Sequence, residues 1–362
     1  MVAAGAMAFG LACAAATTWS CSSSCTAATS GNEDDGCGDY QCVGGGCDYF
    51  PIDATIDHVS PPLDAGPLPD GALYGVEAGY YLAVDSVNLY WIDQSDNIVS
   101  APKDGSGDPK VISSAPTGGI FALGAAGVYY YRTTDGHIGV VPYDGGGETT
   151  IPFQSGFPNS ELPIGSVLVD DANLYYGAPS SDLVRVPLDG GIWIPTAIGF
   201  DAGQYTETFV SAQNSRETFV VMLSSVLPNG PILSVDKISG AVRYLFTPSS
   251  SQNLAADEAY LYVAESYPFD AGIQRVQDDG GLSPLIPNGD FGEIALDDAS
   301  VYSFDLNGLE QINKSDGGMR ALAPNGDDAY TGVIAVDDAY VYLVATDNFG
   351  RSYITRVPKS AP

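Results

Sequence analysis

Short runs in which apolar and polar residues alternate dominate the chain, and one such run recurs along most of its length. In each copy, an apolar strand pattern leads through a turn into a second strand pattern that is rich in tyrosine. Alternation over four to eight residues predicts half-buried β-strands. The clear copies are residues 81–91, 166–176, 254–262, 294–302 and 334–342, and the degenerate copies are 120–129 and 209–222.

These copies recur at a nearly constant interval. Aligned on the turn position that is most often aspartate, they lie 39 to 46 residues apart. The seven aligned residues are Asp85, Gly124, Asp170, Gln213, Asp257, Asp297 and Asp337. A fixed period of this length indicates one supersecondary unit repeated seven times.

A second motif trails each copy by about 15 to 20 residues. It is a strand that ends near Arg-Val-Pro and is followed by Asp-Gly, as in residues 140–146, 185–191 and 275–281. Asp-Gly favours the positive backbone angles of a tight hairpin, so a fourth strand follows, for example at residues 191–195. Four short strands in each of seven units predict an all-β fold, a single seven-bladed β-propeller over residues 72–362.

The two ends of this region predict how the ring closes. The last unit stops on its third strand, at residues 353–358, and residues 72–76 form a strand pattern without a partner of its own. An open ring would leave sheet edges bare. We therefore expect residues 72–76 to complete the last blade.

The run Tyr90-Trp91-Ile92-Asp93, with paired tyrosines at 129–130 and 175–176, resembles the YWTD propeller repeats of the LDL-receptor class. That resemblance implies an extracytoplasmic binding propeller and leaves the ligand open. Domains of that class usually have six blades, so six is the alternative count. The whole chain also resembles acidic propeller-repeat lipoproteins of myxobacteria-like genomes.

Residues 1–20 are apolar and small, as in the core of a signal peptide. A basic leader segment is missing, because the first basic residue is Lys103. This favours a start upstream of Met1, and a transmembrane anchor is the alternative interpretation. Residues 21–71 then form a tether, cysteine-containing at first and rich in Pro and Asp from residue 51, which we expect to be disordered and extended.

All six cysteines precede residue 48. The segment resembles a bacterial lipoprotein, whose lipidated cysteine follows small residues, and Cys21 is the preferred attachment site with Cys13 as the alternative. Cleavage at Cys21 leaves an even set that can form two disulfides of open connectivity. That set is Cys25, Cys37, Cys42 and Cys47. A zinc site is disfavoured, because the spacings do not give two close pairs.

Charge and composition restrict the chemistry. With 45 acidic and 13 basic residues, the net charge of −32 excludes nucleic acid as a partner. Only two histidines are present, His58 and His137. Because hydrolase triads and metal sites usually need histidine, we predict no catalytic residue, no metal site and no cofactor. A pair of carboxylates from different blades would leave no linear motif, so a polysaccharide hydrolase or lyase is the alternative.

The recurring aspartates lie in turns, which topology places on one face of a propeller. We expect them to form an acidic ring that supports turn geometry and solubility and binds divalent cations weakly and without selectivity. Its members are Asp170, Asp171, Asp297, Asp298, Asp337 and Asp338. The tyrosines of the second strands should pack between blades.

The loops on the opposite face vary between units and carry aromatic residues that either anchor a ligand or fold back onto the blades. These candidates are Tyr267, Phe269, Phe291 and Phe349. The sequence therefore predicts an exported, lipid-anchored, non-catalytic module that binds a protein or glycan of the cell envelope, or acts as a scaffold there. Membrane contact is expected only through the lipid, at the outer membrane or the cell surface. Ligand identity and oligomeric state stay open.

Overall fold

The computed structural model describes the strands and turns of residues 68–360, with gaps, and four residues of the segment before them. The described residues are 42–43, 46–47, 68–69, 71–76, 81–114, 121–132, 137–151, 167–177, 182–190, 194–198, 207–223, 230–248, 252–265, 272–277, 280–305, 307–324 and 329–360. The chain divides into two units, one formed by residues 12–66 and the other containing residues 67–362.

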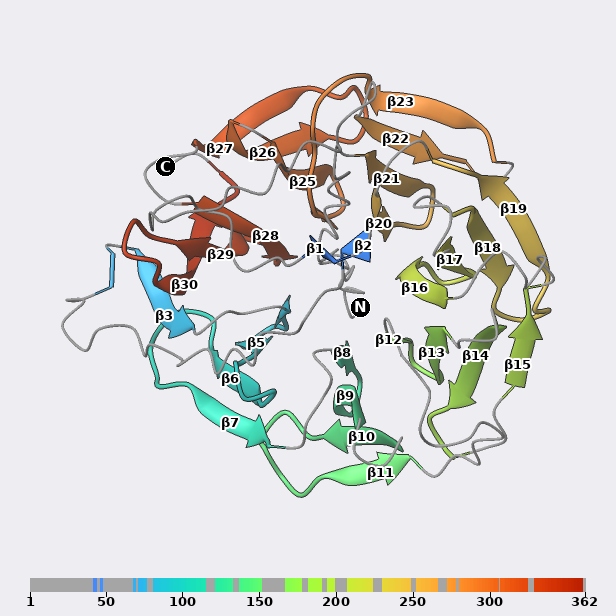
Figure 1. The fold of residues 1–362 in the computed structure, drawn as a ribbon. Coiled ribbons are helices and arrows are strands. Elements are labelled where there is room, and N and C mark those ends of the chain that lie inside the picture. Colours follow the sequence, from blue (N-terminus) through green and yellow to red (C-terminus); the bar gives the residue numbers. More distant parts are fainter. Residues whose placement is uncertain are drawn as a thin grey trace. The chain divides into compact units, whose positions relative to one another are not determined.

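Seven four-stranded antiparallel sheets form a closed ring, with the first strand of each sheet innermost and the fourth outermost (Figure 1). This confirms the predicted all-β propeller and its count of seven blades. We number the blades along the chain and call the connection between the first and second strands the first turn. The connection between the third and fourth strands is the third turn.

The first three blades follow one another along the chain. Blade 1 consists of β4 (Leu82–Val84), β5 (Asn88–Ile92), β6 (Ile98–Pro102) and β7 (Lys110–Ser113). Blade 2 consists of β8 (Phe121–Gly124), β9 (Gly127–Arg132), β10 (His137–Val141) and β11 (Thr149–Ile151). Blade 3 consists of β12 (Val167–Val169), β13 (Asn173–Gly177), β14 (Asp182–Pro187) and β15 (Ile194–Ala197).

Three further blades repeat this order. Blade 4 consists of β16 (Glu207–Gln213), β17 (Glu217–Leu223), β18 (Ile232–Asp236) and β19 (Val242–Phe246). Blade 5 consists of β20 (Gln252–Ala256), β21 (Leu261–Glu265), β22 (Ile273–Val276) and β23 (Leu282–Ile286). Blade 6 consists of β24 (Ile294–Leu296), β25 (Ser300–Asp305), β26 (Gly308–Asn313) and β27 (Met319–Pro324).

Blade 7 joins the two ends of the propeller. It consists of β28 (Ala329–Val336), β29 (Tyr340–Thr346), β30 (Ser352–Pro358) and β3 (Ala72–Val76). β3 runs antiparallel to β30, with Val76 opposite Ser352 (Figure 1). The Tyr74 ring stacks on Trp91 of blade 1 at 5.7 Å between centroids, and its hydroxyl donates to the Pro102 carbonyl at 2.6 Å. The predicted closing strand is therefore confirmed, and it also contacts the neighbouring blade.

Apolar side chains fill the spaces between neighbouring blades. Second-strand tyrosines are the largest of these side chains, and their burial confirms the prediction that they pack between blades. The fully buried ones are Tyr90, Tyr130, Tyr175, Tyr176, Tyr262, Tyr302 and Tyr342. Fully burying one large apolar side chain contributes about 1.5 to 3 kcal/mol, so these interfaces supply much of the driving force for folding.

One repeat position in blade 4 differs from the predicted alignment. The turn residue is Asn214 and not Gln213, because its Oδ1 accepts the N–H groups of Arg216 and Glu217 at 2.9 and 2.7 Å. A β-bulge in β16, between Val210 and Ala212, adds one residue to this strand. Since a bulge shifts every later residue by one place, spacing along the sequence could not locate the turn correctly.

Most of the predicted N-terminal features lie outside the described residues, including Cys13, Cys21, Cys25, Cys37 and His58. The described part is a two-residue pairing of β1 (Cys42–Val43) with β2 (Gly46–Cys47), in which the backbone of Cys42 lies opposite that of Cys47. Among the described residues, no helix has the length and apolar character needed to cross a bilayer.

Ring closure by β3 can be tested by comparing two truncated chains. Removing residues 1–66 should leave the melting temperature unchanged, whereas removing residues 1–80 should lower it. Loss of the buried Tyr74 and Val76 side chains alone takes away about 3 to 6 kcal/mol of burial free energy. Differential scanning calorimetry measures both chains, and equal melting temperatures would contradict closure by β3.

Candidate functional site

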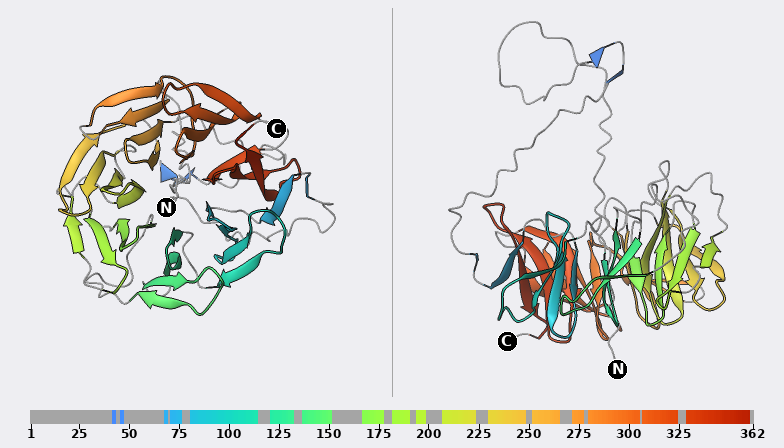
Figure 2. Two further views of the ribbon diagram at one scale, coloured as in Figure 1. Left: turned by 180° about the vertical axis from the view of Figure 1, so that it is seen from behind. Right: turned by 90° about the horizontal axis from the view of Figure 1, so that it is seen from below.

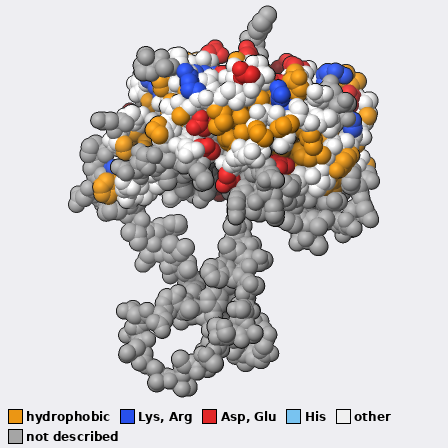
Figure 3. Space-filling view, turned by 90° about the horizontal axis from the view of Figure 1, so that it is seen from above, with side chains coloured by type: hydrophobic (Ala, Val, Ile, Leu, Met, Phe, Trp, Pro, Cys, Tyr) orange, Lys and Arg blue, Asp and Glu red, His pale blue; other side chains and the backbone are white. Residues whose placement is uncertain are grey.

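The first and third turns of the blades share one face of the ring, which we call the turn face. The C-terminus follows β30 onto this face, at the bottom of the edge-on view in Figure 2. Seen edge-on from the other side, both acidic and basic side chains lie along this rim, and hydrophobic side chains cover part of the outer wall (Figure 3). The rim of the turn face therefore carries both signs of charge.

An aspartate at the start of the first turn shapes that turn from within its own blade. In blade 3, Asp170 Oδ1 accepts the N–H groups of Ala172 and Asn173 at 2.9 and 2.8 Å. Its second oxygen, Oδ2, accepts the hydroxyl of Tyr175 at 2.9 Å. The short aspartate side chain suits this place because it reaches backbone donors two and three residues on. Asp85, Asp257, Asp297 and Asp337 cap their turns in the same way.

A lysine from the next blade binds the same carboxylate. Lys237 begins the third turn of blade 4, and its ammonium lies 3.0 Å from Asp170 Oδ2 and 5.2 Å from the centre of the Tyr175 ring. Three further junctions repeat the pair, with Lys314–Asp257 at 2.7 Å, Lys359–Asp297 at 2.6 Å and Lys103–Asp337 at 2.6 Å. Each ion pair thus joins two neighbouring blades.

An arginine completes each of these junctions in the opposite direction. Arg185 of blade 3 donates to the backbone carbonyl of Lys237 in blade 4. The equivalent bonds run from Arg275 to Lys314, from Arg320 to Lys359 and from Arg356 to Lys103. We call each set of Asp, Tyr, Lys and Arg a junction clamp. Four clamps use eight of the thirteen basic residues of the chain.

The remaining three junctions are closed differently, and each lacks the lysine. Between blades 1 and 2, Tyr143 takes the lysine position and packs on Tyr90 at 5.5 Å between ring centroids. Between blades 2 and 3, the lysine position is Leu188 and the aspartate position is Gly124. Between blades 4 and 5, the Asn214 amide donates directly to the Asp257 carbonyl at 3.3 Å. The lysine is present only where the preceding blade supplies the carboxylate.

The clamps keep their aspartates ionised. Burial alone would raise the pKa of Asp170, but two backbone N–H groups and the Lys237 ammonium hold the pKa of that carboxyl below its usual value. The pKa values of Asp257, Asp297 and Asp337 are lowered by the same balance, with Lys314, Lys359 and Lys103 as the cations. Burial raises the pKa of the tyrosines in the clamps, so these phenols stay protonated donors.

The six aspartates predicted to form an acidic ring fall into two groups. The first residue of each pair is half-buried in a clamp, namely Asp170, Asp297 and Asp337, and the second is exposed, namely Asp171, Asp298 and Asp338. The half-buried ones already have their oxygens engaged by protein donors. In the described part of the chain, no group of three or more His, Cys, Asp or Glu side chains is placed to hold a metal ion.

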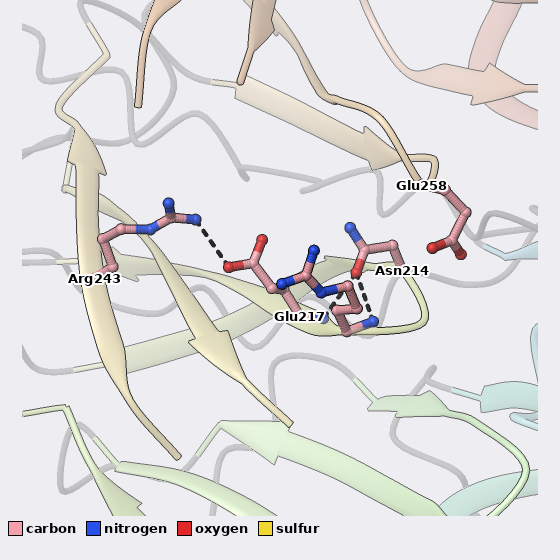
Figure 4. Close-up of a pocket in the computed structure, with 5 residues that line it drawn as sticks. Asn214, Glu217, Arg243 and Glu258 are labelled. Atoms are coloured by element: carbon pink, nitrogen blue, oxygen red, sulfur yellow. Dashed lines mark hydrogen bonds and ion pairs between the residues drawn. The ribbon is translucent and has the colours of Figure 1, made fainter. Parts of the chain in front are cut away.

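A shallow pocket of about 80 Å³ lies on the turn face between blades 4 and 5 (Figure 4). The first turn of blade 4 contributes Asn214 and Arg216, and Glu217 begins β17. Arg243 comes from β19 and Glu258 from the first turn of blade 5. Arg243 pairs with Glu217 at 2.8 Å. The Glu258 oxygens accept the N–H and hydroxyl of Ser215 at 3.1 and 2.5 Å. The lining is therefore entirely polar and contains both signs of charge.

The aromatic residues predicted to contact a ligand were placed on the opposite face of the propeller, which we call the loop face. The structure shows that they differ in exposure. Phe349 lies between β29 and β30 and is 78% exposed, with the Arg351 guanidinium 5.4 Å from its ring centre. Phe291 is only 1% exposed and packs in the core of blades 5 and 6, so it cannot contact a ligand from solvent. Tyr267 and Phe269 lie outside the described residues.

Sequence reasoning did not single out the clamp lysines and arginines or the pocket. Aspartate and lysine in a clamp are 57 to 67 residues apart, or 234 across the closure, so no local motif joins them. One pattern in the sequence could have revealed the clamps. Where a unit has aspartate at its first turn and tyrosine five residues later, the next unit has lysine directly after its third strand. The exception, Asp85 with Tyr143, replaces the cation by a second aromatic ring.

Comparison with known proteins identifies the fold and no family. No protein-family model matches the chain, and no curated protein matches its sequence. Among solved structures, the extracellular domain of BT4673 from B. thetaiotaomicron is similar, with a TM-score of 0.55 and 14% identity. The match covers 79% of this chain and 42% of that one, so this chain spans less than half of that protein's length.

Two other solved structures match over nearly their full length. YCF48 bound to the D1 peptide has a TM-score of 0.50 and 13% identity, with 82% of this chain and 99% of that chain covered. Oligogalacturonate lyase from Vibrio parahaemolyticus has a TM-score of 0.53 and 10% identity, with 81% and 92% covered. At such identities the likeness shows the propeller fold alone. The resemblances to YWTD repeats and to bacterial lipoproteins therefore stay predictions.

The clamps can be tested by removing one lysine charge. Lys314→Met should lower the free energy of unfolding by about 1 to 3 kcal/mol, because it leaves the half-buried Asp257 carboxylate without its cation. Lys110→Met is the matched control, since among the described residues the Lys110 ammonium has one hydrogen bond, to the Asp144 carbonyl at an exposed site. Chemical denaturation measures both variants. An equal loss of unfolding free energy in the two variants would show that the clamp lysine stabilises the fold no more than a surface charge does.

Proposed function

We propose that this chain is an exported, lipid-anchored β-propeller that binds a protein or a glycan of the cell envelope without catalysing a reaction. One observation carries the proposal: the exposed ring of Phe349 stands on a turn whose backbone is already fixed. An aromatic ring that is 78% exposed and held on a fixed turn is the kind of side chain that anchors a partner at an interface.

Asp347 organises the turn that presents this ring. Its Oδ1 accepts the N–H groups of Phe349 and Arg351 at 2.9 and 3.0 Å, and its Oδ2 pairs with the Arg351 guanidinium at 2.6 Å. The Gly350 N–H also bonds to the Asp347 carbonyl. A turn held by four such contacts loses little conformational entropy on binding, so more of the interaction free energy of the ring becomes affinity.

The propeller that carries this turn supports the same function. The four clamps and the closing strand β3 fix the blades to one another, so loops on the loop face extend from a rigid scaffold. The fold itself carries both binding and catalysis, as a structure with a bound peptide and a lyase among the similar proteins illustrate. The proposal therefore depends on Phe349 and not on the fold.

The proposed localisation rests on the N-terminal cysteines. We place the lipid on Cys21 and expect two disulfides among Cys25, Cys37, Cys42 and Cys47. The backbone register of Cys42 opposite Cys47 supports pairing these two, because directly opposed residues of antiparallel strands lie within the distance that a disulfide spans. Cys25 would then pair with Cys37.

Binding through Phe349 is tested with envelope fractions and a glycan array. Phe349→Ala should reduce retention of the bound partner at least tenfold, since an aromatic anchor commonly contributes more than about 1.4 kcal/mol. Ile238→Ala is the matched control, because Ile238 is 92% exposed on the turn face. Unchanged binding in Phe349→Ala would overturn the proposal, as would release of oligosaccharides from a polysaccharide on the array.

Lipid anchoring is tested independently of binding. When the protein is expressed with its native leader, mass spectrometry of the membrane fraction should find diacylglycerol on Cys21. Cys21→Ser should move the protein to the soluble fraction, because each buried methylene of an acyl chain contributes about 0.8 kcal/mol to membrane binding. Cys13→Ser should leave it in the membrane fraction, and the reverse pattern would assign the lipid to Cys13.

A further inference from the structure

Three consecutive blades carry short connections between their second and third strands, on the loop face. These second turns are residues 305–308 of blade 6, 347–351 of blade 7 and 93–97 of blade 1 (Figure 1). In each of them, an aspartate at the end of the second strand accepts two backbone N–H groups of the turn. We call these three turns the short-turn sector, and Phe349 lies on the middle one.

A contact between blades holds the turns of blades 7 and 1 beside each other. Val76 of β3 lies opposite Ser352, the residue that directly follows the turn of blade 7. Two residues before Val76, the Tyr74 ring stacks on Trp91 at 5.7 Å between centroids. Trp91 precedes Asp93, where the turn of blade 1 begins, by two residues. A ligand that contacts Phe349 therefore lies next to the turn of blade 1.

One residue of the blade 1 turn has an unfavourable backbone conformation. The Asp96 N–H bonds to the Asp93 carbonyl as the Gly350 N–H bonds to that of Asp347, so Asp96 corresponds to Gly350. Gly350 has φ 76° and Asp96 has φ 58°, and Asp96 is the one residue other than glycine with positive φ among the described residues. Glycine adopts this conformation without steric cost, whereas aspartate does so at a cost in stability. The exposed carboxylate thus occupies a position where glycine would suit the turn better, which points to a role beyond the turn itself.

Phe349 has no apolar neighbour of its own kind on this face. Within the described part of the chain, every other exposed large hydrophobic side chain lies on a fourth strand, beside β3 or on the turn face. A protein interface usually buries a cluster of apolar side chains at its centre. A single ring surrounded by polar turns therefore disfavours a protein as the ligand.

The other exposed side chains of the short-turn sector are suited to hydroxyl groups. They are amides, a hydroxyl and a carboxylate, from Asn307, Asn348, Gln94, Ser95 and Asp96. An amide offers both a donor and an acceptor, a carboxylate is a strong acceptor, and a sugar hydroxyl can act in either sense. The sector therefore combines one aromatic ring with several polar groups of the kind that orient a small ligand.

The charges of the sector exclude an anionic ligand. Arg351 is the one basic residue in the three turns, and its Nε and a terminal nitrogen lie 2.7 and 2.6 Å from Asp347 Oδ2. Its guanidinium also lies over the Phe349 ring, 5.4 Å from the centre, so it supports one face of the ring and leaves the other for a ligand. A protein of net charge −32 repels acidic polysaccharides.

We infer that the short-turn sector binds a neutral glycan, with one sugar ring stacked on Phe349 and its hydroxyls bonded by Asn348, Gln94 and Asp96. A sugar ring presents a flat face of C–H groups, which packs against the face of an aromatic ring. This inference rests on the proposed function, because it names the class of ligand for the same site.

Calorimetric titrations of the full chain test the ligand class. The probes are cellohexaose, maltohexaose and N-acetylchitohexaose, which are neutral, and hexagalacturonate, which is anionic. At least one neutral probe should bind saturably, and at least tenfold more tightly than hexagalacturonate. Phe349→Tyr keeps the flat ring and should bind that probe within threefold of the unmodified protein. Phe349→Leu stays apolar but lacks a flat face, and should bind it at least tenfold more weakly.

A second variant separates binding from stability. Asp96→Gly should weaken the neutral probe at least threefold and leave the melting temperature unchanged or raise it, because glycine suits the positive φ of this position. Asp171→Ala is the matched control, since it removes an exposed carboxylate from the turn face and should bind as the unmodified protein does.

The outcomes distinguish this inference from the proposed function. Failure of all three neutral probes to bind, preference for hexagalacturonate, or unchanged affinity in Asp96→Gly would overturn the inference. So would an envelope protein that is captured by the unmodified chain and by Phe349→Leu but lost in Phe349→Ala, and that result would leave the proposed function standing with a protein as the ligand. Glycan binding that Phe349→Ala leaves unchanged would overturn both.

Discussion

A single carboxylate at the first turn of a blade serves two blades at once. One oxygen of Asp170 fixes the backbone of its own turn, and the other receives the Tyr175 hydroxyl and the Lys237 ammonium of the following blade. Local turn geometry and the angle between neighbouring sheets are thereby coupled through one side chain. Since both faces of every sheet must be buried against neighbours, the packing of the tyrosines depends on these junctions being held in register.

The chain concentrates its few cations where this coupling occurs. Eight of thirteen basic residues lie in clamps, while the exposed second aspartates, such as Asp171 and Asp298, receive none of these four lysines. A net charge of −32 opposes compaction through self-repulsion, so the position of each cation matters more than it would in a balanced protein. Half-buried pairs are also screened less by salt than surface pairs.

The repeats in the sequence made the architecture predictable. The side-chain contacts between neighbouring repeats could not be predicted in this way. The seven units, the buried tyrosines and the closing strand at residues 72–76 followed from periodicity and from the need to pair strand edges. The bulge in β16 moved the turn of blade 4 from Gln213 to Asn214, because an extra residue in the strand shifts every later residue by one place. Lys237 and Asp170 belong to different units, so their ion pair depends on how two blades meet. Whether Phe291 or Phe349 is exposed likewise depended on packing that a loop sequence does not encode.

Blade 7 combines the first strand of the propeller with the last three, and this has a consequence for the order of folding. β3 and β30 are separated by the whole domain, yet they pair strand to strand. During synthesis, which begins at the N-terminus, β3 emerges about 280 residues before its partner. Contacts at such separation form late, because the entropy of closing the loop must be overcome first. The ring therefore cannot close until the final strand has been synthesised, and the nascent chain keeps an open sheet edge until then.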